Sequence, residues 1–147
     1  VYARAVVAER LDKLDVLEAD LLKILEKNPD DVGALNALGY SLTDRTQRYD
    51  EAEKYLSKAM QLQPDEAVII DSYGWLLFKQ GKAVQALEYL KKAYAKQAEN
   101  EIAAHIAEVM WSQGNVKEAK EFFDAVFKKF PDDEYLLKFK RRFLSGE

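Results

Sequence analysis

Apolar residues recur along the chain at intervals of three and four, which places them on one face of an α-helix. Leu35, Leu38 and Leu42 follow this spacing. Gly81 and Gly114 each follow such a run, where the end of a helix needs the left-handed conformation that glycine adopts freely. The pattern predicts an all-α chain of short helices joined by tight turns.

Small residues recur along the chain with a constant period. One series consists of Gly39, Gly74 and Ala107, at intervals of 35 and 33 residues. A second series consists of Ala52, Ala86 and Ala119, at intervals of 34 and 33. A small residue is needed where two paired helices cross closely, because a larger side chain would force them apart. Both series therefore indicate one repeated helical hairpin.

This pattern resembles the tetratricopeptide repeat, whose signature is a bulky residue, Leu-Gly, an aromatic, Ala with an aromatic four residues later, and Pro. The resemblance implies an all-α, right-handed α-solenoid of antiparallel helix pairs, within a single domain of residues 1–147. The predicted full repeats are residues 32–66, 67–99 and 100–132. Ala98 stands in place of the closing proline of the second repeat, so an irregular junction is expected near Gln97 to Asn100.

Both ends of the chain carry partial versions of the pattern. Residues 1–31 predict an incomplete repeat, with a first helix over Tyr2 to about Arg10 and a second helix that ends before Pro29. Residues 133–147 predict a capping helix with one apolar face and one charged face. Repeat arrays need such a polar cap to remain soluble.

The first helix of each pair lines the inner surface of a solenoid, and its positions beside the core face define a candidate groove. Aromatic side chains among polar ones are typical of a peptide-binding site. The predicted groove residues are Asn36, Tyr40, Thr43, Asp71, Trp75, Phe78, Lys79, His105, Glu108 and Trp111. Two interpretations of Trp75 and Trp111 stay open, groove and core, because the sequence alone does not fix the phase of each helix.

Candidate chemistry is sparse. The chain has no cysteine and a single histidine, His105, whose neighbours Ala104 and Ile106 supply no base, so we assign no catalytic residue and expect no enzymatic activity. No spacing matches a calcium loop or a zinc site, so no metal or cofactor is expected. A formal charge of −4 with interleaved basic residues argues against nucleic acid as a partner. No apolar run reaches the roughly 20 residues of a spanning helix, so we expect no direct membrane insertion.

Some tetratricopeptide domains hold a C-terminal carboxylate with a fixed set of lysine, asparagine and arginine side chains on these inner faces. In this chain Asn36, Tyr40, Asp71 and Ser72 stand where such a clamp would place much of that set. A clamp for chaperone tails is therefore not expected.

Four segments go beyond the general repeat pattern. They are residues 37–45 (ALGYSLTDR), 71–75 (DSYGW), 101–105 (EIAAH) and 108–111 (EVMW). These segments are similar to the C-terminal repeats of outer-membrane tetratricopeptide lipoproteins of proteobacteria. The resemblance implies a parent protein on the periplasmic face of the outer membrane, an adaptor for envelope proteases or cell-wall enzymes. The lipid-bearing cysteine is absent, as in a C-terminal fragment, and a cytoplasmic location stays open.

Two functions compete on this sequence. The first is an adaptor that binds a protein or peptide client in the groove. The second is an assembly module, because Val6, Val7 and Leu11 would give the N-terminal helix an apolar face that pairs with a second copy as a homodimer.

Overall fold

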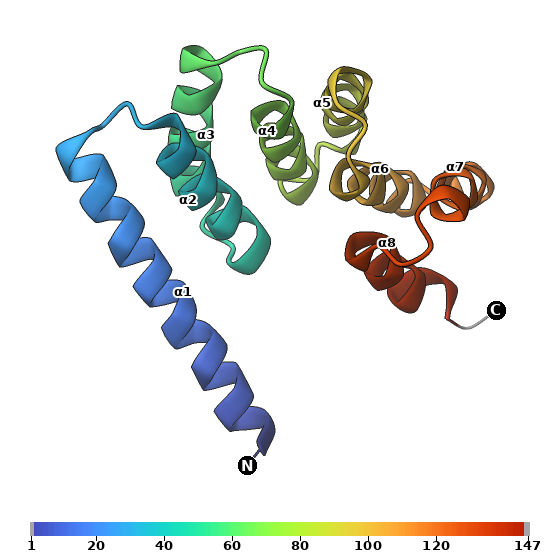
Figure 1. Cartoon of the computed structure of the whole chain (residues 1–147), viewed down its shortest axis with the longest axis horizontal. Coiled ribbons are helices and arrows are strands. Elements are labelled where there is room, and N and C mark those ends of the chain that lie inside the picture. Colours follow the sequence, from blue (N-terminus) through green and yellow to red (C-terminus); the bar gives the residue numbers. More distant parts are fainter. Residues whose placement is uncertain (1, 146–147) are drawn as a thin grey trace. The chain divides into compact units, whose positions relative to one another are not determined.

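The computed structural model describes the backbone of residues 2–145 and the side chains of residues 13–145. All regular elements in this part of the chain are helical (Figure 1). The chain divides into two compact units, Val1–Pro64 and Asp65–Glu147. The elements are α1 (Tyr2–Lys27), α2 (Val32–Arg45), α3 (Tyr49–Leu62), α4 (Ala67–Lys79), α5 (Ala83–Lys96), α6 (Asn100–Ser112), α7 (Val116–Lys129), α8 (Glu134–Phe139) and a π-helical turn, η1 (Lys140–Leu144). No helix in the described part is both long and apolar enough to cross a membrane.

The first unit contains α1 and the antiparallel pair α2 and α3, with α1 packed on α2. Its buried apolar side chains are Leu14 and Leu21 of α1, Ala34, Leu35, Leu38 and Leu42 of α2, and Ala52, Leu56 and Ala59 of α3. The start of α2 is fixed by Asp31, whose carboxylate accepts the Ala34 backbone N–H at 3.0 Å. An N-terminal cap of this kind satisfies a backbone donor that has no partner within the helix.

Helix α1 departs from the expected partial repeat. It is one continuous helix of 26 residues, so the predicted break after Arg10 is wrong. The segment that follows, Leu11-Asp12-Lys13, contains neither glycine nor proline, and nothing in it interrupts the helical hydrogen bonds. The side chains of Val6, Val7 and Leu11, on which the predicted homodimer depends, lie outside the described side chains.

The second unit contains the pairs α4–α5 and α6–α7, with α8 packed on α6. Gly81 and Gly114 occupy the turns within these pairs with φ of +85°, which confirms the left-handed conformation predicted for both. The connection from α5 to α6 has three residues, Gln97 to Glu99, whereas the connection from α7 to α8 has four. The irregular junction predicted at this position is confirmed.

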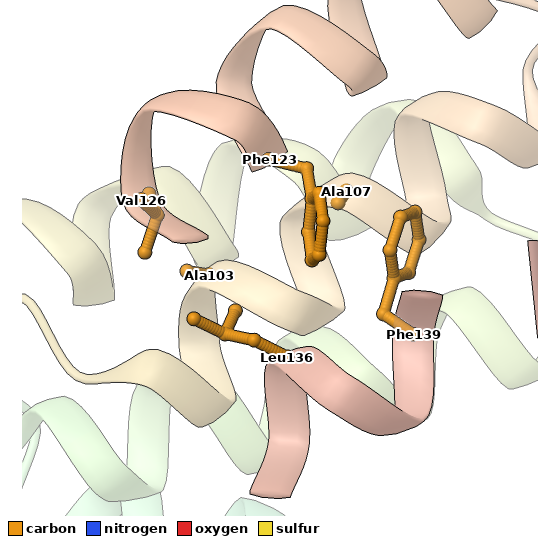
Figure 2. Packing of buried hydrophobic residues seen from close by; sticks show 6 residues of the cluster. All are labelled: Ala103, Ala107, Phe123, Val126, Leu136 and Phe139. Carbon is orange, nitrogen blue, oxygen red and sulfur yellow. The ribbon is translucent and has the colours of Figure 1, made fainter. Parts of the chain in front are cut away.

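Six buried residues form the core at the C-terminal end of the second unit (Figure 2). Ala103 and Ala107 come from α6, Phe123 and Val126 from α7, and Leu136 and Phe139 from α8. The rings of Phe123 and Phe139 lie 4.9 Å apart, centroid to centroid. Helix α8 therefore covers the apolar surface of the α6–α7 pair, as expected of a capping helix.

The two glycines at helix crossings differ in how much room surrounds them. A Cβ atom at Gly39 would lie 2.5 Å from Cγ and 2.6 Å from Cδ2 of Leu56. A Cβ atom at Gly74 would lie 3.1 Å from its nearest neighbours, which belong to Leu90 and Tyr89. Helix α3 thus approaches α2 too closely for any side chain at Gly39, whereas Gly74 leaves almost enough space for a methyl group.

We expect Gly39→Ala and Gly74→Ala to change stability differently. Alanine gains about 1 kcal/mol over glycine within a helix, and overpacking costs about 1–3 kcal/mol. At Gly39 the strain exceeds the gain, so the free energy of unfolding falls by up to about 2 kcal/mol. At Gly74 the two effects cancel to within about 1 kcal/mol. Urea denaturation followed by circular dichroism measures both values. Equal effects of the two substitutions would contradict this explanation.

Candidate protein-binding surface

Three predicted groove residues meet between α4 and α6 in the second unit. The Nδ1 atom of His105 on α6 lies 2.9 Å from Oδ1 of Asp71 on α4, and both side chains are buried. The indole of Trp75 stacks on the imidazole with ring centroids 4.0 Å apart and an interplanar angle of 16°. Asp71, Trp75 and His105 form what we call the Asp71–Trp75–His105 cluster, which joins the first helices of two successive repeats.

Burial decides between the two interpretations of Trp75. Counted over the whole residue, Trp75 is 3% exposed, Asp71 is 4% exposed and His105 is 7% exposed. A partner protein would find almost no surface on these three residues. The core interpretation of Trp75 is therefore the correct one, and the expectation that the cluster residues line an open groove is corrected.

Two other predicted residues lie beside this cluster and keep accessible surface. The ring of Phe78 lies 5.1 Å from that of Trp75, and Lys79 places its Nζ 5.1 Å from the centre of the indole. Both side chains are half-buried. The aromatic face of Trp75 holds the ammonium group of Lys79 by a cation–π contact, which limits the conformations that lysine adopts. Phe78 and Lys79 thus present an apolar and a positively charged group over a packed support.

Glu108 and Trp111 of α6 lie against the C-terminal segment. Arg142 donates a hydrogen bond from Nη1 to Oε1 of Glu108 at 2.9 Å. The ring of Trp111 contacts Phe139 edge-on at 6.2 Å and Phe143 at 5.4 Å. Both predicted residues remain half-buried, so each keeps part of its surface beside the cap.

Arg142 and Phe143 lie at this surface although neither was predicted there, and the repeat period contains a signal for the arginine. Glu108 and Arg142 are separated by 34 residues, and so are Asp71 and His105. In each pair, a carboxylate on the first helix of one repeat contacts a basic side chain 34 positions later. Aligning acidic and basic residues at the repeat spacing would have predicted both contacts.

The remaining predicted residues belong to α2 in the first unit. Thr43 is 1% exposed, and its hydroxyl donates to the Gly39 carbonyl at 2.8 Å, so its predicted place on an open groove is corrected. Asn36 and Tyr40 are half-buried. The Oδ1 atom of Asn36 is buried and has no hydrogen-bond partner among the described residues.

A separate acidic hollow of about 380 Å³ lies in the second unit, where α6 and α8 begin. Glu99, Glu101 and Asp133 line it together with Phe130 and Tyr135. The negative charge of Glu101 raises the pKa of the Tyr135 phenol most, and partial burial, Asp133 and Glu99 raise it further. The neutral phenol is therefore favoured in the folded protein.

We expect Tyr135 to ionise above the ordinary tyrosine range of about 10. The stabilisation by its neutral form is fully present below the unfolded pKa and is lost as pH rises through the higher folded pKa. Replacing Glu101→Gln lowers the pKa of Tyr135, whereas Glu121→Gln, on the exposed side of α7, leaves it unchanged. Carbon-13 NMR of the tyrosine rings against pH measures this shift. An unchanged pKa in the Glu101→Gln variant would disprove the assignment.

The family follows from sequence comparison. Two models described as tetratricopeptide repeat match residues 30–99 and 77–143, so together they span residues 30–143. The chain is 44% identical over 108 residues to the TPR repeat-containing protein PA4667 of Pseudomonas aeruginosa. That match covers 74% of this chain and only 18% of the relative. The chain belongs to the tetratricopeptide repeat family, and it spans less than a fifth of that relative.

Solved structures agree on the fold. TTC0263, a thermophilic TPR protein of Thermus thermophilus, matches with a TM-score of 0.76 and 21% identity over 92% of this chain and 74% of that one. A tetratricopeptide repeat protein of Parabacteroides merdae matches with a TM-score of 0.76 and 17% identity over 95% of this chain and 56% of that one. Proteins of this fold are generally scaffolds for protein–protein interaction.

Proposed function

We propose that the chain is a non-catalytic adaptor that binds a protein or peptide segment on the first helices of its repeats. The observation that carries the proposal is the arrangement of Phe78 and Lys79 over the buried Asp71–Trp75–His105 cluster. The cluster fixes α4 against α6 before any partner arrives. A surface that is already ordered loses less conformational entropy when it binds, which favours affinity.

The predicted groove residues of the second unit then divide into two roles. Phe78, Lys79, Glu108 and Trp111 keep accessible surface and are the proposed contact residues. The three residues of the Asp71–Trp75–His105 cluster are positioning residues, which act through the helices that they join. An aromatic side chain beside separated positive and negative groups suits an extended peptide with apolar and polar side chains.

We further propose that the parent protein faces the periplasm from the outer membrane and that its client is an envelope protease or a cell-wall enzyme. This part of the proposal depends on the similarity of residues 37–45 and 71–75 to the lipoproteins named above. Fractionation of cells into cytoplasm, periplasm and membranes, followed by detection of the parent, tests the location. Recovery of the parent in the cytoplasm would contradict it.

A cross-linking pull-down from a proteobacterial envelope extract tests the binding surface. The intact domain is compared with Phe78→Ser/Lys79→Glu, and with Val84→Ser as a matched control, because Val84 lies 69% exposed on α5. We expect the double variant to lose partners that the intact domain and the control both retain. Circular dichroism confirms that each variant is folded. Equal capture by all three proteins would refute binding on this surface.

Self-association through α1 is the second candidate. Val16, Leu22 and Ile24 of this helix are apolar and 60%, 43% and 44% exposed. Exposed apolar side chains of this kind favour contact with another protein surface. Analytical ultracentrifugation of the domain over a range of concentrations tests it: a dimer that Val16→Ser weakens supports the module, and a monomer throughout excludes it.

A further inference from the structure

A mostly apolar cavity of about 290 Å³ opens in the first unit, where the end of α1 meets α2 and α3. Its lining residues are Leu25, Pro29, Leu35, Lys54, Tyr55 and Lys58. None of them belongs to the predicted groove or to the proposed contact residues. The cavity is therefore a separate feature of the molecule, and the repeat pattern explains how it arises.

The repeat register relates the wall of this cavity to a position in the second unit. Leu25 precedes Pro29 by four residues, and Tyr94 precedes Ala98 by four. Pro29 and Ala98 occupy the same place at the end of a repeat, so Tyr94 is the counterpart of Leu25. The second unit thus carries an aromatic ring where the first unit carries a shorter aliphatic side chain.

The opposite wall has a counterpart as well. Tyr55 follows Ala52 by three residues, and Phe122 follows Ala119 by three, so Phe122 corresponds to Tyr55. In the second unit the rings of Tyr94 and Phe122 meet edge to face with centroids 5.6 Å apart. Both pack against the buried core of that unit. A ring from the preceding helix therefore fills this position in the second unit and is missing in the first.

Two lysines give the cavity a charge preference. Lys54 and Lys58 lie one turn apart on α3, and the described residues that line the cavity include no acid. Lys58 contacts Asp30 at 3.1 Å, but the two side chains are 41% and 68% exposed. An ion pair exposed to this extent contributes little stability, so a carboxylate of another molecule can replace Asp30 at low cost.

We propose that this cavity binds an aromatic side chain of a peptide partner, with an adjacent acidic residue paired to Lys54 or Lys58. The guest ring takes the place that Tyr94 takes in the second unit, against Tyr55. Apolar contact supplies the attraction, and the lysines select for acidic flanks. This inference depends on the proposed function only in that the partner is a protein, since the site is separate from Phe78 and Lys79.

Titration of the domain with the peptide acetyl-Gly-Asp-Tyr-Glu-Gly-amide, followed by nitrogen-15 NMR, tests the site. We expect amide shifts around Leu25 and Tyr55. Leu25→Tyr supplies the missing ring and should weaken binding at least about tenfold, which corresponds to about 1.4 kcal/mol. Leu62→Tyr is the matched control, because Leu62 is 40% exposed at the end of α3 and lies outside the lining. That control should bind as the intact domain does.

Two further peptides keep the test decisive if Leu25→Tyr does not fold. Replacing tyrosine with alanine in the peptide should abolish binding, and replacing its acids with glutamine and asparagine should weaken it severalfold. Equal binding of the alanine peptide, or none by the original peptide, would overturn the proposal. The Phe78→Ser/Lys79→Glu variant should bind the original peptide normally. Loss of peptide binding in the cavity can therefore be distinguished from loss of partner binding at Phe78 and Lys79.

Discussion

Replacing Trp75 with alanine lowers the free energy of unfolding by about 3–5 kcal/mol, the range for a buried large aromatic side chain. Trp75 is 3% exposed and stacks on His105, so its removal leaves a cavity between α4 and α6. Urea denaturation monitored by circular dichroism measures the loss. Phe78→Ala, on the same helix and half-buried, serves as the comparison and should lose less.

The same measurement separates the two interpretations of Trp75. A tryptophan displayed in an open groove would change stability by less than about 1 kcal/mol on truncation, as surface positions do. A loss of that small size would contradict the core assignment. The large expected loss also means that reduced partner binding by Trp75→Ala would not by itself locate the binding surface. Phe78 and Lys79 are therefore the better positions for testing binding.

Replacing His105 with alanine lowers the free energy of unfolding by about 2–4 kcal/mol, because it leaves a buried carboxylate without the imidazole. The Asp71 side chain is 5% exposed and lies 2.9 Å from the imidazole Nδ1 atom. Water does not reach it well enough to replace that contact. Thermal and urea denaturation of the variant measure the loss, which should exceed that of any exposed polar substitution in the same unit.

A double-mutant cycle with Asp71→Leu and His105→Leu isolates the interaction between the two side chains. Removing both polar partners leaves apolar groups of similar size, so the double variant should be more stable than the sum of the single losses implies, by about 1–3 kcal/mol. Arg142→Ala is the matched control at the other pair of this spacing, since Arg142 is 52% exposed and its loss should stay within about 1 kcal/mol. Additive losses at Asp71 and His105 would contradict the coupling.

Much of the fold could be predicted from sequence because its signals are local. The conformation of the two turn glycines depends only on residues a few positions away. The same is true of the shortened junction after Lys96. The capping helix was recognisable from its own apolar face. Helix α1 was misjudged because the break near Arg10 came from the family pattern, whereas the residues there offer no feature that ends a helix.

The candidate surface was harder to predict, because burial on a helix depends on what packs against it. Trp75 lies off the stripe of its own helix that the spacing placed in the core, and His105 of α6 covers it from a position 30 residues later. Single-helix periodicity contains no information about that contact. The 34-residue spacing of Asp71 and His105 does contain such information, because equivalent positions of successive repeats come together when the repeats stack.

The structure separates residues that build the surface from residues that a partner can reach. In the second unit the Asp71–Trp75–His105 cluster supports Phe78 and Lys79. In the first unit, Leu25 leaves open a position that Tyr94 fills in the second. Successive repeats share one backbone pattern, so a smaller side chain at one position leaves a cavity open on the same scaffold.

Site-specific photo-cross-linking tests the central claim most directly, that the chain binds a protein partner on its first helices. A photoreactive amino acid replaces Lys79 on α4 or Val84 on α5 in the parent protein, and living cells are irradiated before the adducts are identified by mass spectrometry. We predict a discrete protein adduct from position 79 and none of the same identity from position 84. Adducts of equal identity and yield from both positions, or an adduct from position 84 alone, would contradict the account.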